Sequence, residues 1–186
     1  MPGPRNAARR PRTQFNSEQL GVLKAVFEKT PCPDWDTLES LAKELKLDTT
    51  VVKVPYTRNV SLCIGSSVTI RGAPANCFRK DPQLQVDFHT GTSEKSDIAF
   101  HFRVYFGHCV VMNSLRCGGW DCEVKSSYMP FTECRQFELC IMVLHNEYQV
   151  VINGQHCYSF AHRVHPASVK MIQVWRDVAL TSVEVC

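Results

Sequence analysis

The sequence contains no long hydrophobic run. No stretch approaches the roughly 20 apolar residues needed to cross a bilayer, and the first residues lack the apolar core of a signal peptide. We therefore expect synthesis in the cytosol and no membrane insertion. A strong charge of one sign is also missing, because the formal net charge is only +3. So small an excess does not indicate a polyanionic partner, although basic residues gather near the start, at Arg5, Arg9, Arg10 and Arg12.

Motifs that carry catalysis or hold metals are absent as well. The ten cysteines include no C-x-x-C pair, and Cys117 and Cys122 have no nearby His/Cys pair at the spacing of zinc ligands. No glycine-rich phosphate loop, no acid/base pair of carboxylates and no serine or cysteine in a nucleophile motif occurs. We expect a protein that is not an enzyme and that uses neither a metal nor a cofactor. Without a signal peptide, reduced cysteines are the default.

Residues 16–54 have the apolar spacing of short helices. Apolar side chains recur there three and four residues apart, at Leu20, Leu23 and Phe27 and again at Leu38, Leu41 and Leu45. Asn16 and Gln19 form a capping pair that predicts the start of the first helix, and Asp34 can cap the second. A third helix is expected after Asp48, cut short because Pro55 lacks an amide hydrogen.

After Pro55 the apolar period changes to two, which indicates β-strands with one buried face. The alternation is clearest at 84–88, 98–106 and 137–143, and Asn153-Gly154 is a favoured hairpin turn after a strand at 148–152. Further strands are expected at 169–174 and 178–185. About ten short strands at regular spacing predict a mainly β protein, an antiparallel sandwich or barrel.

One predicted sheet face is polar and aromatic. The alternation at 98–106 places His101, Arg103 and Tyr105 together, opposite the phenylalanines. The following strand and turn supply further side chains for the same groove, namely Asn113, Trp120, Glu123 and Lys125. A neutral sugar is held by an aromatic ring against its C–H face and by planar donors and acceptors at its hydroxyls. The seven side chains are therefore a candidate carbohydrate site.

Other aromatic and histidine residues have simpler interpretations. Trp175 lies in an apolar strand and is expected in the core. The remaining histidines have no nucleophile partner and are expected at the surface or behind the site: His89, His108, His145, His156, His162 and His165. Arg103, Tyr105 and Lys125 are assigned to the groove by alternation alone.

Three motifs resemble the successive sugar-site motifs of galectins: Phe100-His101-Phe102, Val111-Met112-Asn113-Ser114 and Gly119-Trp120-x-x-Glu123. Segments around Pro55, 82–88 and 174–177 are similar to the placental and Charcot–Leyden crystal branch of that family. The resemblance implies a galectin-type antiparallel β-sandwich, a jelly roll, at 55–186. It also implies a β-galactoside-type glycan partner and a homodimer.

The resemblance assigns roles to four positions. His101 would bond the axial hydroxyl of galactose, Asn113 would contact a ring substituent, Trp120 would stack on the sugar, and Glu123 would hold hydroxyls. Where the family has H-x-N-x-R, this chain has His101-x-Arg103-x-Tyr105, and Lys125 stands where the family has an arginine. Each charged hydrogen bond lost is worth roughly 1.5–3 kcal/mol. Weak or altered sugar specificity is therefore expected, unless Arg103 or Lys125 reaches Glu123.

The amino-terminal residues resemble a paired-type homeodomain, through 9–15, Leu41-Ala42 and 51–54. The similarity stops where a homeodomain continues into its recognition helix, because this chain reads Pro55-Tyr56-Thr57. Specific DNA binding is therefore not expected. The predicted organisation is a basic flexible arm at 1–15, a truncated homeodomain-like helical fragment at 16–54 and a carbohydrate-recognition domain at 55–186.

The sequence supports one leading function and two alternatives. The first is a galectin-like carbohydrate-binding protein with a degenerate site, located in the cytoplasm, with nuclear entry and leaderless secretion left open. The second is a self-associating protein-interaction module that binds no sugar. The third is a nuclear homeobox-type DNA-binding protein that acts through its basic arm.

Overall fold

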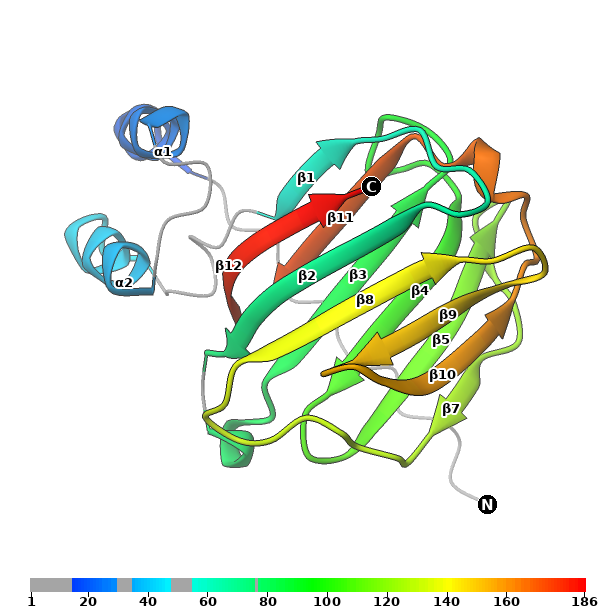
Figure 1. The fold of residues 1–186 in the computed structure, drawn as a ribbon. Helices are drawn as coiled ribbons and strands as arrows, with labels where there is room; N and C mark the ends of the chain where they lie inside the picture. The colour runs from blue at the N-terminus through cyan, green and yellow to red at the C-terminus, as the bar shows by residue number, and fades with distance from the viewer. Residues whose placement is uncertain (1–14, 30–34, 48–54, 76) are drawn as a thin grey trace, which may run out of the picture.

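The computed structural model describes residues 15–29, 35–47, 55–75 and 77–186 (Figure 1). Two helices come first, α1 (Ser17–Lys29) and α2 (Trp35–Glu44). The predicted capping pair is confirmed, since the Asn16 amide donates to Gln19 Oε1 at 3.0 Å and the Gln19 amide donates to Asn16 Oδ1 at 2.8 Å. The predicted cap at Asp34 and the third helix after Asp48 lie outside the described residues. Neither described helix is long and apolar enough to span a bilayer.

The rest of the described chain forms two antiparallel sheets. The seven-stranded sheet has the order β1-β11-β3-β4-β5-β6, and β7 also pairs with β5. Its strands are β1 (Tyr56–Asn59), β3 (Gln83–His89), β4 (Ile98–Tyr105), β5 (Cys109–Arg116), β6 (Gly119–Trp120), β7 (Val124–Ser126) and β11 (Met171–Arg176).

The five-stranded sheet has the order β10-β9-β8-β2-β12. Its strands are β2 (Ser67–Pro74), β8 (Phe137–Val143), β9 (Glu147–Ile152), β10 (Gln155–Ala161) and β12 (Val178–Val185). The described residues form twelve strands instead of the predicted ten or so, because strands as short as β6 show no readable alternation. The predicted hairpin turn joins β9 to β10, with φ of 50° at Asn153 and 80° at Gly154.

The core lies between the two sheets, which face each other in Figure 1. Phe100 on β4 illustrates its packing: its ring centroid lies 4.7 Å from that of Tyr148 on β9 and 5.2 Å from that of Phe160 on β10. All three side chains are buried. The core therefore joins strands of both sheets through aromatic contacts.

The other face of the seven-stranded sheet departs from the predicted half-buried pattern. In β3, Gln85, Asp87 and His89 are 6%, 2% and 2% exposed, although they alternate with the core residues. His101 on β4 is also buried, at 6% exposed. Buried polar groups need hydrogen-bond partners. Gln85, Asp87 and His101 share a polar network, whereas neither ring nitrogen of His89 has a hydrogen-bond partner among the described residues.

Candidate functional site

Strand pairing brings the polar residues of three strands into line. His101 on β4 is opposite Asp87 on β3 and opposite Asn113 on β5. Around this row lies an open pocket of about 600 Å³, lined by Gln85, His101, Arg103, Tyr105, Val111, Asn113, Trp120, Asp121, Glu123, Trp175 and Arg176. Ligand pockets commonly have volumes of about 300–1,000 Å³, so this one has room for a small ligand.

Asp87 organises the floor of the pocket. Its carboxylate accepts hydrogen bonds from Gln85 Nε2 at 2.7 Å, His101 Nδ1 at 2.6 Å and Trp175 Nε1 at 3.3 Å. Because an ionised carboxylate only accepts, the proton of the His101 bond belongs to Nδ1. The second ring nitrogen, Nε2, is therefore left for a ligand.

Trp120 provides an exposed aromatic surface beside His101. Its side chain is 54% exposed, and its ring centroid lies 4.8 Å from that of His101 at an interplanar angle of 61°. Strand β6, which carries Trp120, pairs with β5 through Leu115. A large ring that stays exposed while its position is fixed by pairing is suited to stacking on a ligand.

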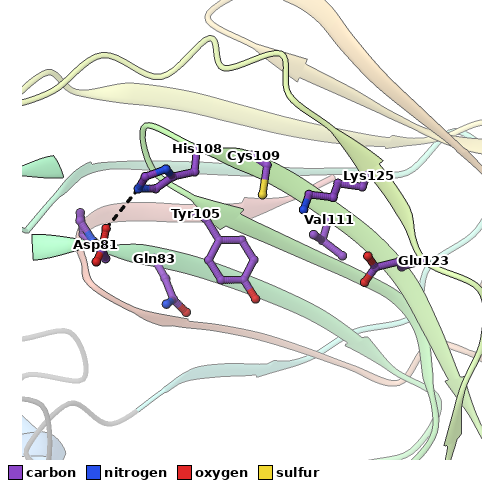
Figure 2. A pocket seen from close by; sticks show the side chains of 9 residues that line it. Asp81, Gln83, Tyr105, His108, Cys109, Val111, Glu123 and Lys125 are labelled. Carbon is purple, nitrogen blue, oxygen red and sulfur yellow. Dashed lines mark hydrogen bonds and ion pairs between the residues drawn. The ribbon is translucent and has the colours of Figure 1, made fainter. Parts of the chain in front are cut away.

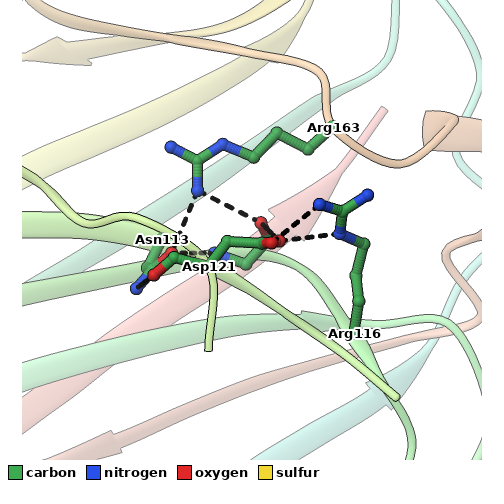
Figure 3. A network of polar contacts seen from close by, with 5 residues as sticks. Asn113, Arg116, Asp121 and Arg163 are labelled. Carbon is green, nitrogen blue, oxygen red and sulfur yellow. Dashed lines mark hydrogen bonds and ion pairs between the residues drawn. The ribbon is translucent and has the colours of Figure 1, made fainter. Parts of the chain in front are cut away.

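Asn113 is held in place by its neighbours on and beyond β5 (Figure 3). Its Nδ2 donates to the Asp121 carbonyl at 2.9 Å, and its Oδ1 accepts from Arg163 Nη1 at 3.0 Å and from the Ser114 amide at 2.8 Å. Arg163 also stacks over Phe160, 4.6 Å from the ring centroid. One amide hydrogen of Asn113 remains for a ligand.

Asp121 is the charged centre of the same network. It accepts from Arg116 Nε and Nη2, both at 2.7 Å, and from Ser114 Oγ at 2.7 Å. These hydrogen bonds, with Arg116 the larger contributor and Ser114 the next, lower the pKa of Asp121 to about 2. The ion pair between Asp121 and Arg116 thus helps to hold β6, which carries Trp120, against β5.

We expect acid to release this turn only at very low pH. The folded-state pKa of Asp121 lies below the roughly 3.9 of an unfolded aspartate, so its stabilising contribution is complete above about pH 4 and is lost as the pH falls through about 2. A ¹³C NMR titration of the side-chain carboxyl carbon measures this pKa directly. Arg116→Gln removes the main donor and should raise the pKa of Asp121, and an unchanged titration in that variant would contradict the assignment.

Arg103 does not reach Glu123. Its Nη2 and Nε donate to Gln83 Oε1 at 2.6 and 3.2 Å, and its guanidinium lies 4.8 Å from the Tyr105 ring centroid. Glu123 is exposed and makes no ion pair with any described residue. The possibility that Arg103 or Lys125 pairs with Glu123 is therefore not realised.

Six of the seven predicted site residues line the same pocket, and Lys125 does not. Lys125 lines an adjoining pocket of about 470 Å³, shown in Figure 2, whose wall includes Tyr105, Val111 and Glu123. These three residues line both pockets. The far end of the second pocket is formed by His108, which contacts Asp81 Oδ1 at 3.1 Å.

The prediction that Trp175 belongs to the core is wrong. Its side chain is partly exposed, lines the pocket and donates to Asp87. The guanidinium of Arg176 lies 4.0 Å from the Trp175 ring centroid, and its Nε donates to Gln85 Oε1 at 3.1 Å. Burial, and next the charge of Arg103, lower the pKa of Arg176.

Several site residues were absent from the sequence prediction: Gln85, Asp87, Asp121, Arg163, Trp175 and Arg176. On β11, Gln173 pairs with Asp87 and Trp175 pairs with Gln85. Because residues two apart in a strand share a face, the polar Gln173 indicated that Trp175 lies on the polar face as well. Arg163 is 50 residues from Asn113 in sequence and gave no local signal. Across the described residues, no group of three or more histidine, cysteine or acidic side chains could hold a metal ion.

Comparison with known proteins places this geometry in context. The sequence model of galactoside-binding lectins matches residues 53–185, and that of homeodomains matches residues 9–56. Galactoside-binding soluble lectin 13 from Homo sapiens is 55% identical over 133 residues, which cover 72% of this chain and 96% of that protein. Galectin-16 from Homo sapiens is 52% identical over 130 residues, covering 70% of this chain and 92% of that protein.

Solved structures agree with the sequence comparisons. A substituted form of human galectin-16 is 50% identical and superposes with a TM-score of 0.68, covering 72% of this chain and 95% of that one. Sheep galectin-11 in complex with glycerol is 43% identical, with a TM-score of 0.67 and coverage of 71% and 97%.

Proposed function

This chain belongs to the galactoside-binding lectin family, and we propose that it binds carbohydrate through the pocket of the seven-stranded sheet with a specificity altered from that of a β-galactoside site. The observation that carries the proposal is the arrangement around His101, whose Nδ1 is fixed by Asp87 at 2.6 Å and whose ring lies against the exposed Trp120. A hydroxyl-binding nitrogen beside an aromatic platform meets the two requirements of a pyranose.

The altered specificity is proposed because two residues in the middle of the pocket, Arg103 and Tyr105, differ from the galectin pattern. Arg103 and Tyr105 stand where the galectin pattern has asparagine and arginine, and Arg103 directs its Nε and Nη2 at Gln83 rather than at Glu123. Lys125 faces the adjoining pocket. No planar fork is therefore presented to the hydroxyls next to Glu123, so neutral galactosides are expected to bind weakly.

We assign the proposed site to a domain at 55–186 and treat 1–15 as a basic arm and 16–54 as a homeodomain-like fragment. The fragment ends where β1 starts, and Tyr56 pairs with Val174 of β11. A homeodomain would continue at this point toward the helix that enters the major groove. Sequence-specific DNA binding is therefore not part of the proposal, whereas a homodimer is retained as the assembly that the family resemblance implies.

Trp120→Ala in the full chain is expected to weaken glycan binding about tenfold or more, because the variant loses the stacking surface while leaving the polar network in place. The measurement is a glycan array followed by calorimetry on each glycan that binds. Tyr128→Ala is the matched control, since Tyr128 is 52% exposed and does not line the pocket. Retained binding in the Trp120 variant would reject this site. A folded protein that binds no glycan would instead favour a protein-interaction module.

A further inference from the structure

Two arginines lie close together at one end of the pocket. Gln85 of β3 is paired with Arg103 on β4 on one side and with Trp175 on β11 on the other, and Arg176 follows Trp175 directly. Arg103 and Arg176 both line the pocket. The charge of Arg103 is strong enough at Arg176 to lower its pKa, after the larger effect of burial. Two positive charges therefore share a partly desolvated corner.

Neither charge is neutralised by an ion pair within the described part of the chain. The polar partner of each guanidinium is a neutral glutamine oxygen, Gln83 Oε1 for Arg103 at 2.6 Å and Gln85 Oε1 for Arg176 at 3.1 Å. The carboxylates of Asp177 and, less strongly, Asp87 act on Arg176 at longer range and raise its pKa, and Asp87 already accepts three hydrogen bonds. Burial and the charge of Arg103 outweigh these two carboxylates, because the pKa of Arg176 is lowered on balance, so an anion placed between the two guanidiniums is favoured.

Both guanidiniums are held with N–H groups to spare. Arg103 lies 4.8 Å from the Tyr105 ring centroid and Arg176 lies 4.0 Å from that of Trp175, so each plane is fixed by an aromatic ring. Arg103 uses Nε and Nη2 for Gln83, and Arg176 uses Nε for Gln85. Arg103 Nη1 and both terminal nitrogens of Arg176 make no hydrogen bond to a described residue. Preorganised forks of this kind suit oxyanions.

The backbone conformation of Arg176 also supports a binding site at this corner of the pocket. Its φ is 90°, a region that side chains other than glycine rarely adopt. Strained backbone persists where the surrounding structure holds it, and it concentrates at binding sites. The positive φ therefore shows that the surroundings of Arg176 hold its backbone in a conformation that glycine would adopt more easily.

We propose that Arg103 and Arg176 form a subsite for the anionic substituent of an acidic glycan, a carboxylate or a sulfate group, while the sugar ring lies toward His101 and Trp120. The inference rests on the proposed carbohydrate-binding function. Asp121 and Glu123 line other parts of the pocket and repel an anion there, so the charge distribution also sets the direction in which the glycan lies.

The test compares three probes by calorimetry on the full chain: lactose, lactose carrying sialic acid and lactose carrying a sulfate group. We expect at least one acidic probe to bind about tenfold more tightly than lactose, and the two acidic arms distinguish carboxylate from sulfate. Arg176→Gln should reduce this preference to about twofold or less, and Arg176→Lys, which keeps the charge without the fork, should fall between. Raising the salt from about 0.05 to about 0.5 M should also diminish it.

Arg58→Gln is the control, because Arg58 is an exposed arginine on β1 of the same sheet and does not line the pocket. An equal loss in that variant would mean general attraction by a basic protein and would overturn the subsite. Lactose binding as tight as that of both acidic probes would overturn the subsite and leave the proposed function standing. A folded chain that binds none of these probes, nor any glycan on the array, overturns both. Thermal melting of each variant confirms that it is folded.

Discussion

Phe100→Ala is expected to lower the free energy of unfolding of the sandwich by about 3–5 kcal/mol. The side chain is fully buried, and its ring lies near those of Phe88, Tyr148 and Phe160. Because Phe88 belongs to one sheet and the other two belong to the opposite sheet, truncation opens a cavity between the layers rather than at an edge. Urea denaturation followed by tryptophan fluorescence measures the loss.

Phe78→Ala is the comparison for that variant. Phe78 is only partly buried and stacks on a single ring, that of Phe106, with centroids 5.6 Å apart. Its truncation removes less apolar contact and allows water to fill the space, so the expected loss is less than half as large. Equal losses in the two variants would show that Phe100 does not have the bridging role described above.

Asp87→Ala is expected to destabilise the protein by about 3 kcal/mol and to disorder the polar face that lines the pocket. The substitution leaves the donors of Gln85, His101 and Trp175 without their common acceptor in a region where Asp87 itself is 2% exposed. Water cannot easily replace the carboxylate there, so each donor bears part of its desolvation penalty. Thermal or urea unfolding gives the stability change.

Asp87→Asn separates the charge of this group from its shape. The amide keeps one acceptor oxygen and nearly the same volume, so we expect a loss of stability smaller than that of the alanine variant. The ¹⁵N resonances of the His101 ring report whether Nδ1 still carries the proton. A His101 ring that keeps its native tautomer and position in Asp87→Ala would contradict the role given to Asp87.

The part of the site that was predictable from sequence comes from strand alternation. Phe100 and Phe102 on one side and His101 and Arg103 on the other follow from a period of two, which depends only on local backbone geometry. The aromatic and polar chemistry of the polar side then indicated a sugar. The confirmed galectin fold rests on the same residues, because the motifs that carry the resemblance lie in β4, β5 and β6.

The rest depended on contacts between distant segments. Asp87 could be placed on a polar face from its own strand, but its role required knowing that β3 pairs with β4 in the register Asp87 to His101. Trp175 was misassigned because three of the four preceding residues are apolar, yet the indole N–H makes tryptophan suitable for a polar face. Arg163 reaches Asn113 from a loop that follows β10, and no spacing rule links the two.

Strand β1 is an edge of its sheet and pairs with β11 alone. All the ladders of the two sheets consequently begin at Tyr56 or later. The lectin match begins at residue 53 and the homeodomain match ends at residue 56, so the two overlap at the entrance to this edge strand. A recombination event at this point would replace all the residues before β1 together. It would leave unchanged the strand pairings on which the pocket depends, because these involve only residues from Tyr56 onward.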